Sequence, residues 1–327
     1  MKRIGVVGAG RMGRGIALTY IFAGVRVCLL DAKDRDTDAQ ASLKEEVHAE
    51  LTADLNFLAD QGLMSRQEIP ATLELLEFSC HLQDLTDCDV IYDAVPEVLD
   101  IKAQIFAQIC RYCRDDAIVA STTSTFLVTD LAQYVTHPSR FLNAHWLNPA
   151  HLMPLIELSV SETTDKSIVA SFVSSLERIG KKPVVCSAAP GYIVPRIQAL
   201  AMNEAARLVE EGVASAEDVD KAILYGFGLR FSVLGVLEFI DWGGGDILYH
   251  ASKYLEQKAG PRYRVPDIVA ENMASNRNGL RDGEGFFSYQ DVDINAYRRN
   301  RMKDFVRALR RQDLLPEHRS PDTRSRS

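Results

Sequence analysis

The run Ile4-Gly5-Val6-Val7-Gly8-Ala9-Gly10-Arg11-Met12-Gly13 decides the fold class of this 327-residue chain. Residues 4–7 form a short run typical of a buried strand, and residues 8–13 have the G-x-G-x-x-G spacing that opens a helix after such a strand. Gly8 permits the tight turn, Gly10 lets a pyrophosphate approach the backbone, and Gly13 lets the helix pack against the strand. Free amides and the helix dipole attract phosphate at this point. The run therefore predicts a Rossmann-like domain that binds a dinucleotide at residues 8–13.

The residue after the second predicted strand indicates which dinucleotide is bound. That strand, residues 25–30, is followed by Asp31, which lies about 20 residues after Gly8. A carboxylate at this place accepts hydrogen bonds from the two hydroxyls of the adenosine ribose, and its charge repels a 2′-phosphate. Lys33 lies close by and weakens this preference only slightly. Asp31 therefore predicts NAD rather than NADP as the cofactor.

Apolar runs of strand length alternate with helical patterns in the first half of the chain, which is the sequence form of a parallel sheet covered by helices. Helical patterns at residues 37–61 and 65–75 predict a helical hairpin inserted into the sheet order. After Pro190-Gly191 the pattern is helical almost throughout. We therefore predict an α/β fold, with a Rossmann-like, mainly parallel sheet followed by an all-helical domain. The expected strands are residues 4–7, 25–30, 90–93, 117–120, 140–144, 155–158 and 183–186.

The change of pattern also predicts the domain boundaries. We expect a Rossmann-like NAD-binding domain over residues 1–187 and a helical domain over residues 188–316. Residues 317–327 are rich in Arg, Ser, Pro and Asp and have no apolar periodicity. We expect this segment to be a disordered tail.

The bulk composition narrows the compartment and the partners. The chain has 37 Lys and Arg against 45 Asp and Glu, a net charge of −8, which disfavours binding to nucleic acid or to an anionic membrane surface. No apolar run approaches the roughly 18 residues of a membrane helix, and no signal segment precedes the first strand. The cysteines have no disulfide-framework pattern, and Cys110 and Cys113 are expected to be reduced thiols rather than a metal or redox site. We expect a cytoplasmic protein with a small-molecule substrate and without a metal.

Three polar motifs lie at the ends of predicted strands, where α/β enzymes place their sites. They are Ser121-Thr122-Thr123-Ser124, His145-Trp146-Leu147-Asn148-Pro149 and Pro154-Leu155-Ile156-Glu157. In this order and spacing the chain resembles the L-3-hydroxyacyl-CoA dehydrogenase superfamily, from about residue 3 to about residue 290. The family has a serine in an S-x-T-S run, an H-x-x-N-P motif, and a glutamate twelve residues after the histidine. Ser124, His145, Asn148 and Glu157 occupy these positions.

The resemblance implies hydride transfer between NAD and an L-3-hydroxyacyl substrate of the 3-hydroxybutyryl-CoA type, in fatty acid metabolism. His145 is then the general base, because an imidazole titrates near neutrality, and Glu157 fixes its tautomer. Ser124 would contact both the reacting oxygen and the cofactor, and Asn148 would hold the nicotinamide end. The helical domain is implied to bind substrate and to form a homodimer. Further cofactor contacts are implied for Glu97, Lys102 and Arg281.

Two departures from the family pattern bear on the substrate. The family's G-F-I-V-N-R stretch reads Gly191-Tyr192-Ile193-Val194-Pro195-Arg196 here, so that Pro195 replaces an active-site asparagine and offers no donor. Coenzyme A-using members have a G-Y-P-M-G-P run where this chain has Gly226-Phe227-Gly228-Leu229-Arg230-Phe231. Arg230 would suit a substrate carboxylate, as in the branch that acts on free hydroxy acids such as gulonate or carnitine, and equally suits a plain surface position.

The substrate class therefore stays open between a thioester and a free 3-hydroxy acid. The hairpin over residues 37–75 resembles one that contacts coenzyme A in the family, but the free-acid members keep a hairpin too. A further alternative is a non-catalytic, NAD-binding relative. Pro195 favours it, whereas the complete set of Ser124, His145 and Glu157 disfavours it.

Overall fold

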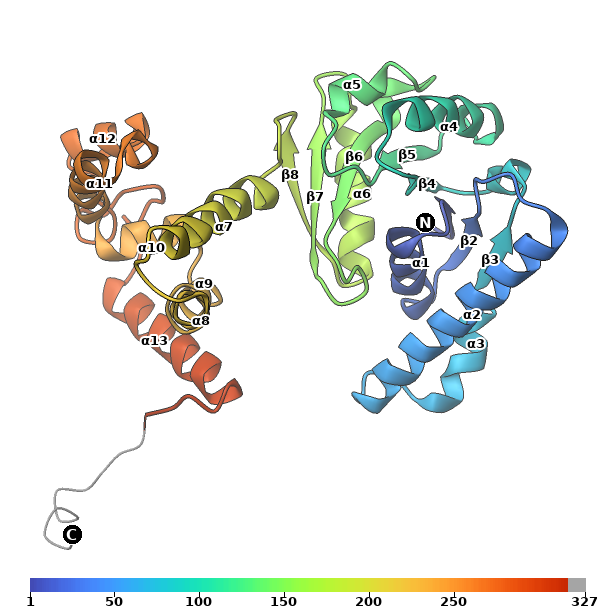
Figure 1. Cartoon of the computed structure of the whole chain (residues 1–327). Coiled ribbons are helices and arrows are strands. Elements are labelled where there is room, and N and C mark those ends of the chain that lie inside the picture. The colour runs from blue at the N-terminus through green and yellow to red at the C-terminus, as the bar shows by residue number, and fades with distance from the viewer. Residues whose placement is uncertain (317–327) are drawn as a thin grey trace, which may run out of the picture. The chain divides into compact units, whose positions relative to one another are not determined.

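The computed structural model describes residues 1–316 and consists of two compact units, Met1–Ala201 and the described residues from Met202 on (Figure 1). Helix α7 (Val194–Glu210) is continuous through the division between them. The predicted domain boundary near residue 188 stays a prediction, and the predicted tail at residues 317–327 lies outside the described residues.

An eight-stranded sheet forms the centre of the first unit, with the strand order β3-β2-β1-β4-β5-β6-β7-β8. All neighbouring strands run parallel except β6 and β7, which are antiparallel. The connection between β6 and β7 is too short for the crossover that a parallel pair requires. The strands are β1 (Arg3–Val7), β2 (Arg26–Leu30), β3 (Leu76–Ser79), β4 (Val90–Asp93), β5 (Ile118–Ser121), β6 (Phe141–Trp146), β7 (Leu155–Val160) and β8 (Lys182–Ser187).

The predicted α/β class is confirmed, and every predicted strand has a counterpart in this sheet. Strand β3 was not predicted. It has only four residues, lies at the edge of the sheet and carries the half-exposed Glu77, so its apolar signal is weak.

Helices cover both faces of the sheet because successive side chains of each strand point to opposite sides. Ile4 and Val6 of β1 enter the core cluster that includes α1 and α6, whereas Val7 enters the cluster that includes α4 and α5. The predicted hairpin is present, with α2 and α3 side by side (Figure 1). The helices of this unit are α1 (Arg11–Phe22), α2 (Thr37–Asp60), η1 (Arg66–Glu68), α3 (Ile69–Leu73), η2 (Leu82–Leu85), α4 (Leu99–Tyr112), α5 (Val128–Ala132), η3 (Pro138–Arg140), α6 (Lys166–Arg178) and the first part of α7.

The regular elements of the second unit are all helices in its described part, as predicted, and the loop between α12 and α13 contains only isolated β-bridges. A buried carboxylate organises it: Asp241 accepts hydrogen bonds from the amides of Phe286 and Phe287, both at 2.9 Å, and from the hydroxyl of Tyr289 at 3.1 Å. Its helices are the rest of α7, α8 (Ala216–Ala222), η4 (Ile223–Gly228, a π-helical turn), α9 (Leu229–Phe231), α10 (Val236–Gly243), α11 (Gly245–Ala259), η5 (Pro261–Tyr263), α12 (Asp267–Ala274) and α13 (Ile294–Arg311).

No single helix in residues 1–316 is both long enough and apolar enough to cross a bilayer. One consecutive pair, Ala216–Phe231 and Val236–Gly243, reaches that length and apolarity together, but its two parts are bent by 86°.

Candidate active site

The glycine turn between β1 and α1 has the geometry that a pyrophosphate requires. Gly8 has a φ of +114°, and a Cβ on it would lie 2.6 Å from the carbonyl oxygen of Ala94. A Cβ on Gly13 would lie 1.9 Å from the carbonyl oxygen of Gly8, so the helix can approach the turn only without a side chain there. A Cβ on Gly10 would meet nothing within 4 Å. The turn therefore leaves open space beside Gly10, where the free amides of the helix start can receive phosphate oxygens.

Asp31 lies next to this turn, directly after β2. Its side chain is only 5% exposed, and it belongs to the lining of a cavity of about 470 Å³ that also includes Gly8 and Gly10. The carboxylate oxygen Oδ2 accepts a hydrogen bond from Nε of Arg35 at 2.6 Å. Asp31 and the glycine turn thus share one hollow, as a dinucleotide site requires, and Arg35 is an additional cation in it.

Lys102 is part of a buried ionic cluster at the carboxyl end of β4. Its side chain is 1% exposed, and its Nζ lies 2.8 Å from Oδ2 of Asp93 and 3.4 Å from Oε2 of Glu97. Asp93 also accepts a hydrogen bond from the hydroxyl of Ser121, at 2.8 Å. The cofactor contact predicted for Lys102 stays a prediction, and in this arrangement the amine would act on a ligand through Glu97.

Glu97 connects this cluster to the loop that carries Ser124. One carboxylate oxygen accepts hydrogen bonds from the amide of Ser124 at 3.1 Å, from the amide of Thr125 at 3.0 Å, and from the hydroxyl of Thr123. Burial raises the pKa of Glu97, but the Thr123 hydroxyl and the Lys102 charge outweigh it, so the net pKa is lowered. The loop is therefore fixed by a charged carboxylate, while the side chain of Ser124 is exposed.

His145 and Glu157 lie directly opposite each other on the antiparallel strands β6 and β7. The ring nitrogen Nδ1 of His145 is 2.8 Å from Oε2 of Glu157, and the residues are 7% and 1% exposed. The other carboxylate oxygen of Glu157 accepts the amides of Ile193 at 2.9 Å and Val194 at 2.8 Å. Within residues 1–316, Nε2 of His145 has no hydrogen-bond partner. This nitrogen is free to exchange a proton with a ligand.

Asn148 lies in the loop between β6 and β7, next to a smaller hollow of about 310 Å³ that also includes Arg11 from the start of α1. Lys181 holds this loop: its Nζ donates to the carbonyl oxygens of Ala150 at 2.6 Å and Met153 at 2.9 Å. Burial lowers the pKa of Lys181 to about 8. The start of α1 and the loop after β6 therefore line one hollow.

Comparison with known proteins assigns the family. The model described as 3-hydroxyacyl-CoA dehydrogenase, NAD binding domain, matches residues 3–189, and the model of the C-terminal domain of the same enzyme matches residues 191–289. The chain belongs to the 3-hydroxyacyl-CoA dehydrogenase family. It is an NAD-dependent oxidoreductase that acts on a CH–OH group.

Individual relatives agree with this assignment. A 3-hydroxybutyryl-CoA dehydrogenase of Mycobacterium tuberculosis is 33% identical over 294 residues, covering 88% of this chain and 99% of the relative. A 5-formyl-3-hydroxy-2-methylpyridine 4-carboxylate 5-dehydrogenase of Mesorhizobium japonicum is 29% identical over 313 residues, covering 95% of this chain and 98% of the relative. The crystal structure of a 3-hydroxyacyl-CoA dehydrogenase of Archaeoglobus fulgidus is 32% identical, with a TM-score of 0.75, and the match covers 96% of this chain and 100% of that one.

Sequence reasoning missed Tyr192 of this dehydrogenase. Its ring stacks on His145, with centroids 4.8 Å apart and planes inclined by 16°. Its hydroxyl donates to the carbonyl oxygen of Thr123 at 2.7 Å and accepts from Nδ2 of Asn143 at 3.1 Å. The backbone of Tyr192 has a φ of +47°, which costs a non-glycine residue on the order of 1–3 kcal/mol. The tyrosine in place of the phenylalanine of the family's G-F-I-V-N-R stretch was the available signal.

Pro195 of the dehydrogenase lies in the first turn of α7, where the missing amide removes no intrahelical hydrogen bond. The two amides just before it, those of Ile193 and Val194, are the ones that Glu157 binds. The substitution of the family asparagine therefore leaves the carboxylate contact intact.

The remaining predicted residues belong to the second unit of the dehydrogenase. Arg281 forms an ion pair with Asp246 at 2.6 Å. Arg230 is exposed, and its guanidinium lies 5.6 Å from the ring centre of Phe239. No carboxylate within residues 1–316 pairs with Arg230. Both predicted roles stay predictions.

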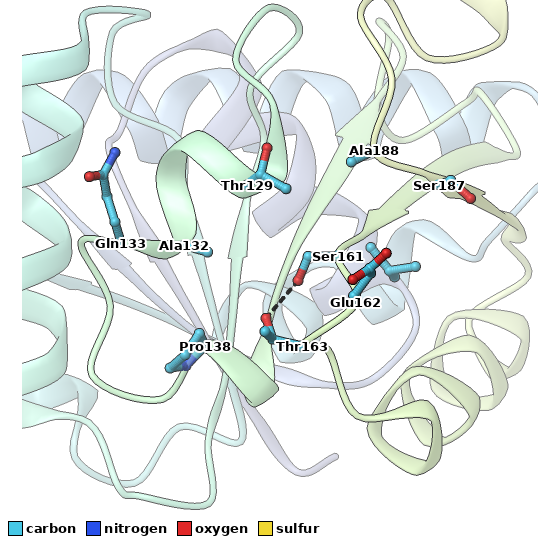
Figure 2. A pocket seen from close by; sticks show the side chains of 10 residues that line it. Thr129, Ala132, Gln133, Pro138, Ser161, Glu162, Thr163, Ser187 and Ala188 are labelled. Atoms are coloured by element: carbon cyan, nitrogen blue, oxygen red, sulfur yellow. Dashed lines mark hydrogen bonds between the residues drawn. The ribbon is translucent and has the colours of Figure 1, made fainter.

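A separate hollow of about 770 Å³ lies at the amino end of β6 of the dehydrogenase (Figure 2). Its lining comes from α5, from Pro138 of η3, from the loop after β7 and from the end of β8. Ser161 and Thr163 belong to that loop, and their hydroxyls are 2.8 Å apart (Figure 2). The lining includes none of the residues predicted for the site.

Proposed function

We propose that this dehydrogenase oxidises the 3-hydroxyl group of a short L-3-hydroxyacyl-CoA thioester, of the 3-hydroxybutyryl-CoA type, with His145 as the general base. The observation that carries the proposal is the contact of 2.8 Å between Nδ1 of His145 and Oε2 of Glu157. Because the two backbone amides occupy the other carboxylate oxygen, Glu157 is fixed in place and accepts a hydrogen bond from Nδ1–H of His145. The lone pair of the imidazole is then on Nε2.

The proton transfer follows from this tautomer. Nε2 of His145 takes the proton of the substrate hydroxyl as the C–H bond at the same carbon breaks, and bound NAD supplies the hydride acceptor. Glu157 stabilises the imidazolium that forms. Ser124 is exposed on the loop fixed by Glu97, and we assign its hydroxyl to the reacting oxygen. In the reverse direction the imidazolium returns the proton to the same oxygen.

We assign the cofactor contacts to the edge of the sheet where the glycine turn lies. The open space beside Gly10 suits the pyrophosphate, Asp31 suits the adenosine ribose, and Glu97 and Asn148 suit the nicotinamide half. Lys102 supports Glu97 from within the core. Arg281 is assigned by the family pattern alone.

Replacement of the base tests the assignment. We expect His145→Gln to lower kcat by roughly 10³-fold, since general acid–base catalysis contributes about 10²–10⁴, while the Kd for NADH changes by no more than about twofold. The matched control is His137→Gln, because His137 also faces a carboxylate, Asp115 at 3.3 Å, but on the exposed surface. Unchanged turnover in His145→Gln would contradict the assignment.

The substrate class requires a second measurement. NADH formation by the wild-type enzyme with 3-hydroxybutyryl-CoA, 3-hydroxybutyrate, gulonate and carnitine separates the candidates. We expect turnover with the thioester and little with the free acids. Turnover confined to a free acid would refute the thioester and leave the role of His145 untouched.

The second candidate is the same oxidation of a small carboxylate-bearing hydroxy compound. Two observations favour it. Arg230 on α9 is exposed and pairs with no carboxylate in residues 1–316, and the name of the Mesorhizobium relative, which covers nearly the whole chain, specifies a pyridine carboxylate. On this alternative, Arg230→Gln raises the KM of the acid substrate, because a guanidinium binds a carboxylate in bidentate fashion.

We also propose that the enzyme is a homodimer. Several apolar side chains of the second unit are strongly exposed in the single chain, among them Leu224 at 63%, Ile247 at 61% and Tyr254 at 61%. Exposed apolar surface of this kind marks association sites. Sedimentation velocity at micromolar concentration provides the test, and a monomeric species would contradict the proposal.

A further inference from the structure

The hollow beside the glycine turn contains more positive charge than a site for NAD requires. Three cationic side chains, Arg14, Lys33 and Arg35, line it together with two carboxylates, Asp31 and Glu46. The 2′-position of the adenosine ribose would lie near Asp31. The partners of each cation therefore decide which of them could bind an anion at that position.

Arg14 is already paired with two carboxylates of α2. Its Nε donates to the carbonyl oxygen of Ala9 at 2.8 Å, and its NH1 donates to Glu46 at 2.8 Å and also to Glu50. These contacts join α1 to α2 and set the single charge of Arg14 against two carboxylates, so Arg14 adds no unpaired positive charge to the hollow. Asp31 is the carboxylate of the lining that pairs with Arg35.

The guanidinium of Arg35 has a single contact with a protein acceptor in residues 1–316. Its Nε donates to Oδ2 of Asp31 at 2.6 Å, and the side chain of Arg35 is 31% exposed. The two terminal nitrogens of the guanidinium have no hydrogen bond or ion pair within the described part of the chain. Lys33 is exposed, and its amine likewise has no carboxylate partner in residues 1–316. Asp31 thus fixes the guanidinium in the cavity wall with its two outer amino groups unused.

We propose that Arg35 is a specificity-determining residue for the cofactor, and that Lys33 and Arg35 form a phosphate subsite that Asp31 counteracts. A guanidinium binds a phosphate through two parallel hydrogen bonds, and Asp31 repels that phosphate from the same place. The preference for NAD over NADP then depends on the balance between one carboxylate and two cations. We expect the wild-type enzyme to bind NADPH measurably, although more weakly than NADH.

The two residues therefore have opposite effects on NADPH. Removing Arg35 removes an attraction that the 2′-phosphate alone uses, whereas removing the charge of Asp31 removes a repulsion that the 2′-phosphate alone experiences. NADH has no 2′-phosphate, so for this cofactor the loss of Arg35 removes only a side chain that contacts Asp31, the acceptor for the ribose hydroxyls. The ratio of the two dissociation constants isolates this effect from changes in fold or in the glycine turn, which both cofactors share.

Fluorescence titration of the full-length protein with NADH and with NADPH, without substrate, measures that ratio. We expect Arg35→Ala to weaken NADPH binding by about tenfold, as for the loss of one charge-assisted contact, and NADH binding by less than threefold. Asp31→Asn is expected to tighten NADPH binding by about tenfold, and Asp31→Asn/Arg35→Ala to lose most of that gain. Arg66→Ala is the matched control, because Arg66 pairs with an aspartate, Asp60, on the exposed part of the hairpin.

Two outcomes overturn the proposal. One is an unchanged NADPH-to-NADH ratio in Arg35→Ala, with or without a lower melting temperature, since it would restrict the Asp31–Arg35 pair to holding the loop before α2. The other is an Asp31→Asn/Arg35→Ala double variant that keeps the full NADPH gain of Asp31→Asn. Because no substrate is present, neither outcome depends on the assignment of His145 or on the substrate class.

Discussion

Two buried pairs of side chains in the first unit, the ion pair of Lys102 with Asp93 and the hydrogen-bonded pair of His145 with Glu157, differ in what their environment leaves unbonded. The amine of Lys102 lies between the carboxylates of Asp93 and Glu97. The ring of His145 is bonded only at Nδ1, and its Nε2 has no partner in residues 1–316. The amine of the Lys102–Asp93 pair is bonded on both sides, and through Glu97 the pair helps to fix the loop that carries Ser124. The second pair keeps one atom available, and that atom is where proton transfer takes place in our proposal.

The sharpest way to break this comparison is Glu157→Gln. The amide oxygen would stay with the backbone amides of Ile193 and Val194, so the NH₂ group would face Nδ1 of His145. That donor forces the imidazole proton onto Nε2, where it blocks acceptance of the substrate proton. We expect kcat to fall by about 10³-fold, since an equivalent carboxylate-to-amide change in a His–carboxylate pair costs up to about 10⁴. Steady-state kinetics provide the measurement, with Asp115→Asn, the surface partner of His137, as control.

Substitutions in the Lys102–Asp93 pair should change the stability of the protein rather than its turnover. Lys102→Met leaves Asp93 buried without its cation, which costs about 3–5 kcal/mol of unfolding free energy. The variant Asp93→Asn/Lys102→Met, which removes both charges, should be more stable than Lys102→Met alone. Urea unfolding followed by circular dichroism gives both values. If Lys102→Met stays within about 1 kcal/mol of the wild type, a threshold set by that expected cost, the amine is not essential to the cluster.

Tyr192→Phe tests the tyrosine hydroxyl beside the His145–Glu157 pair. The variant keeps the ring stacked on His145 but loses the hydroxyl contacts to Thr123 and Asn143. We expect a loss of about 2 kcal/mol in stability, since each of the two hydrogen bonds has a usual net value of about 1 kcal/mol, and a decrease in kcat of less than about tenfold. Tyr192→Leu removes the ring as well and should lower kcat further. Equal kcat values in the two variants would mean that the stacking has no role.

The smallest expected effect concerns pH and Glu97. The pKa of this carboxyl is lowered in the folded protein, because the Thr123 hydroxyl and the Lys102 charge outweigh the effect of burial. A lowered pKa contributes stability above the unfolded value of about 4.3 and loses it as the pH falls through the folded value. The stability difference between wild type and Glu97→Gln should therefore shrink as the pH falls from 6 to 3. Thermal melts across this range measure it, and a constant difference would contradict the assigned cause.

The sequence was sufficient where a local pattern determines the geometry. The glycine turn follows from three glycines whose Cβ atoms would meet the backbone or fill the open space. Most strands follow from short apolar runs between turns. The pairing of His145 with Glu157 was expected from the family pattern, and its physical basis is the register of β6 and β7, which places the two residues opposite each other.

The sequence was insufficient where partners are distant along the chain. Tyr192 contacts Thr123 and Asn143, and Lys181 binds carbonyl oxygens of the loop after β6. No local pattern encodes such contacts. The Asp31–Arg35 pair was missed for a different reason, because a spacing of four residues is readable in a helix but not in a loop whose conformation is unknown.

Glu157 binds the two amides at the beginning of α7, and α7 continues without a break from the first unit into the second. One carboxylate therefore contacts both the imidazole of His145 and the first turn of α7. A substitution that displaces this first turn is expected to displace the acceptor that faces Nδ1 of His145 as well.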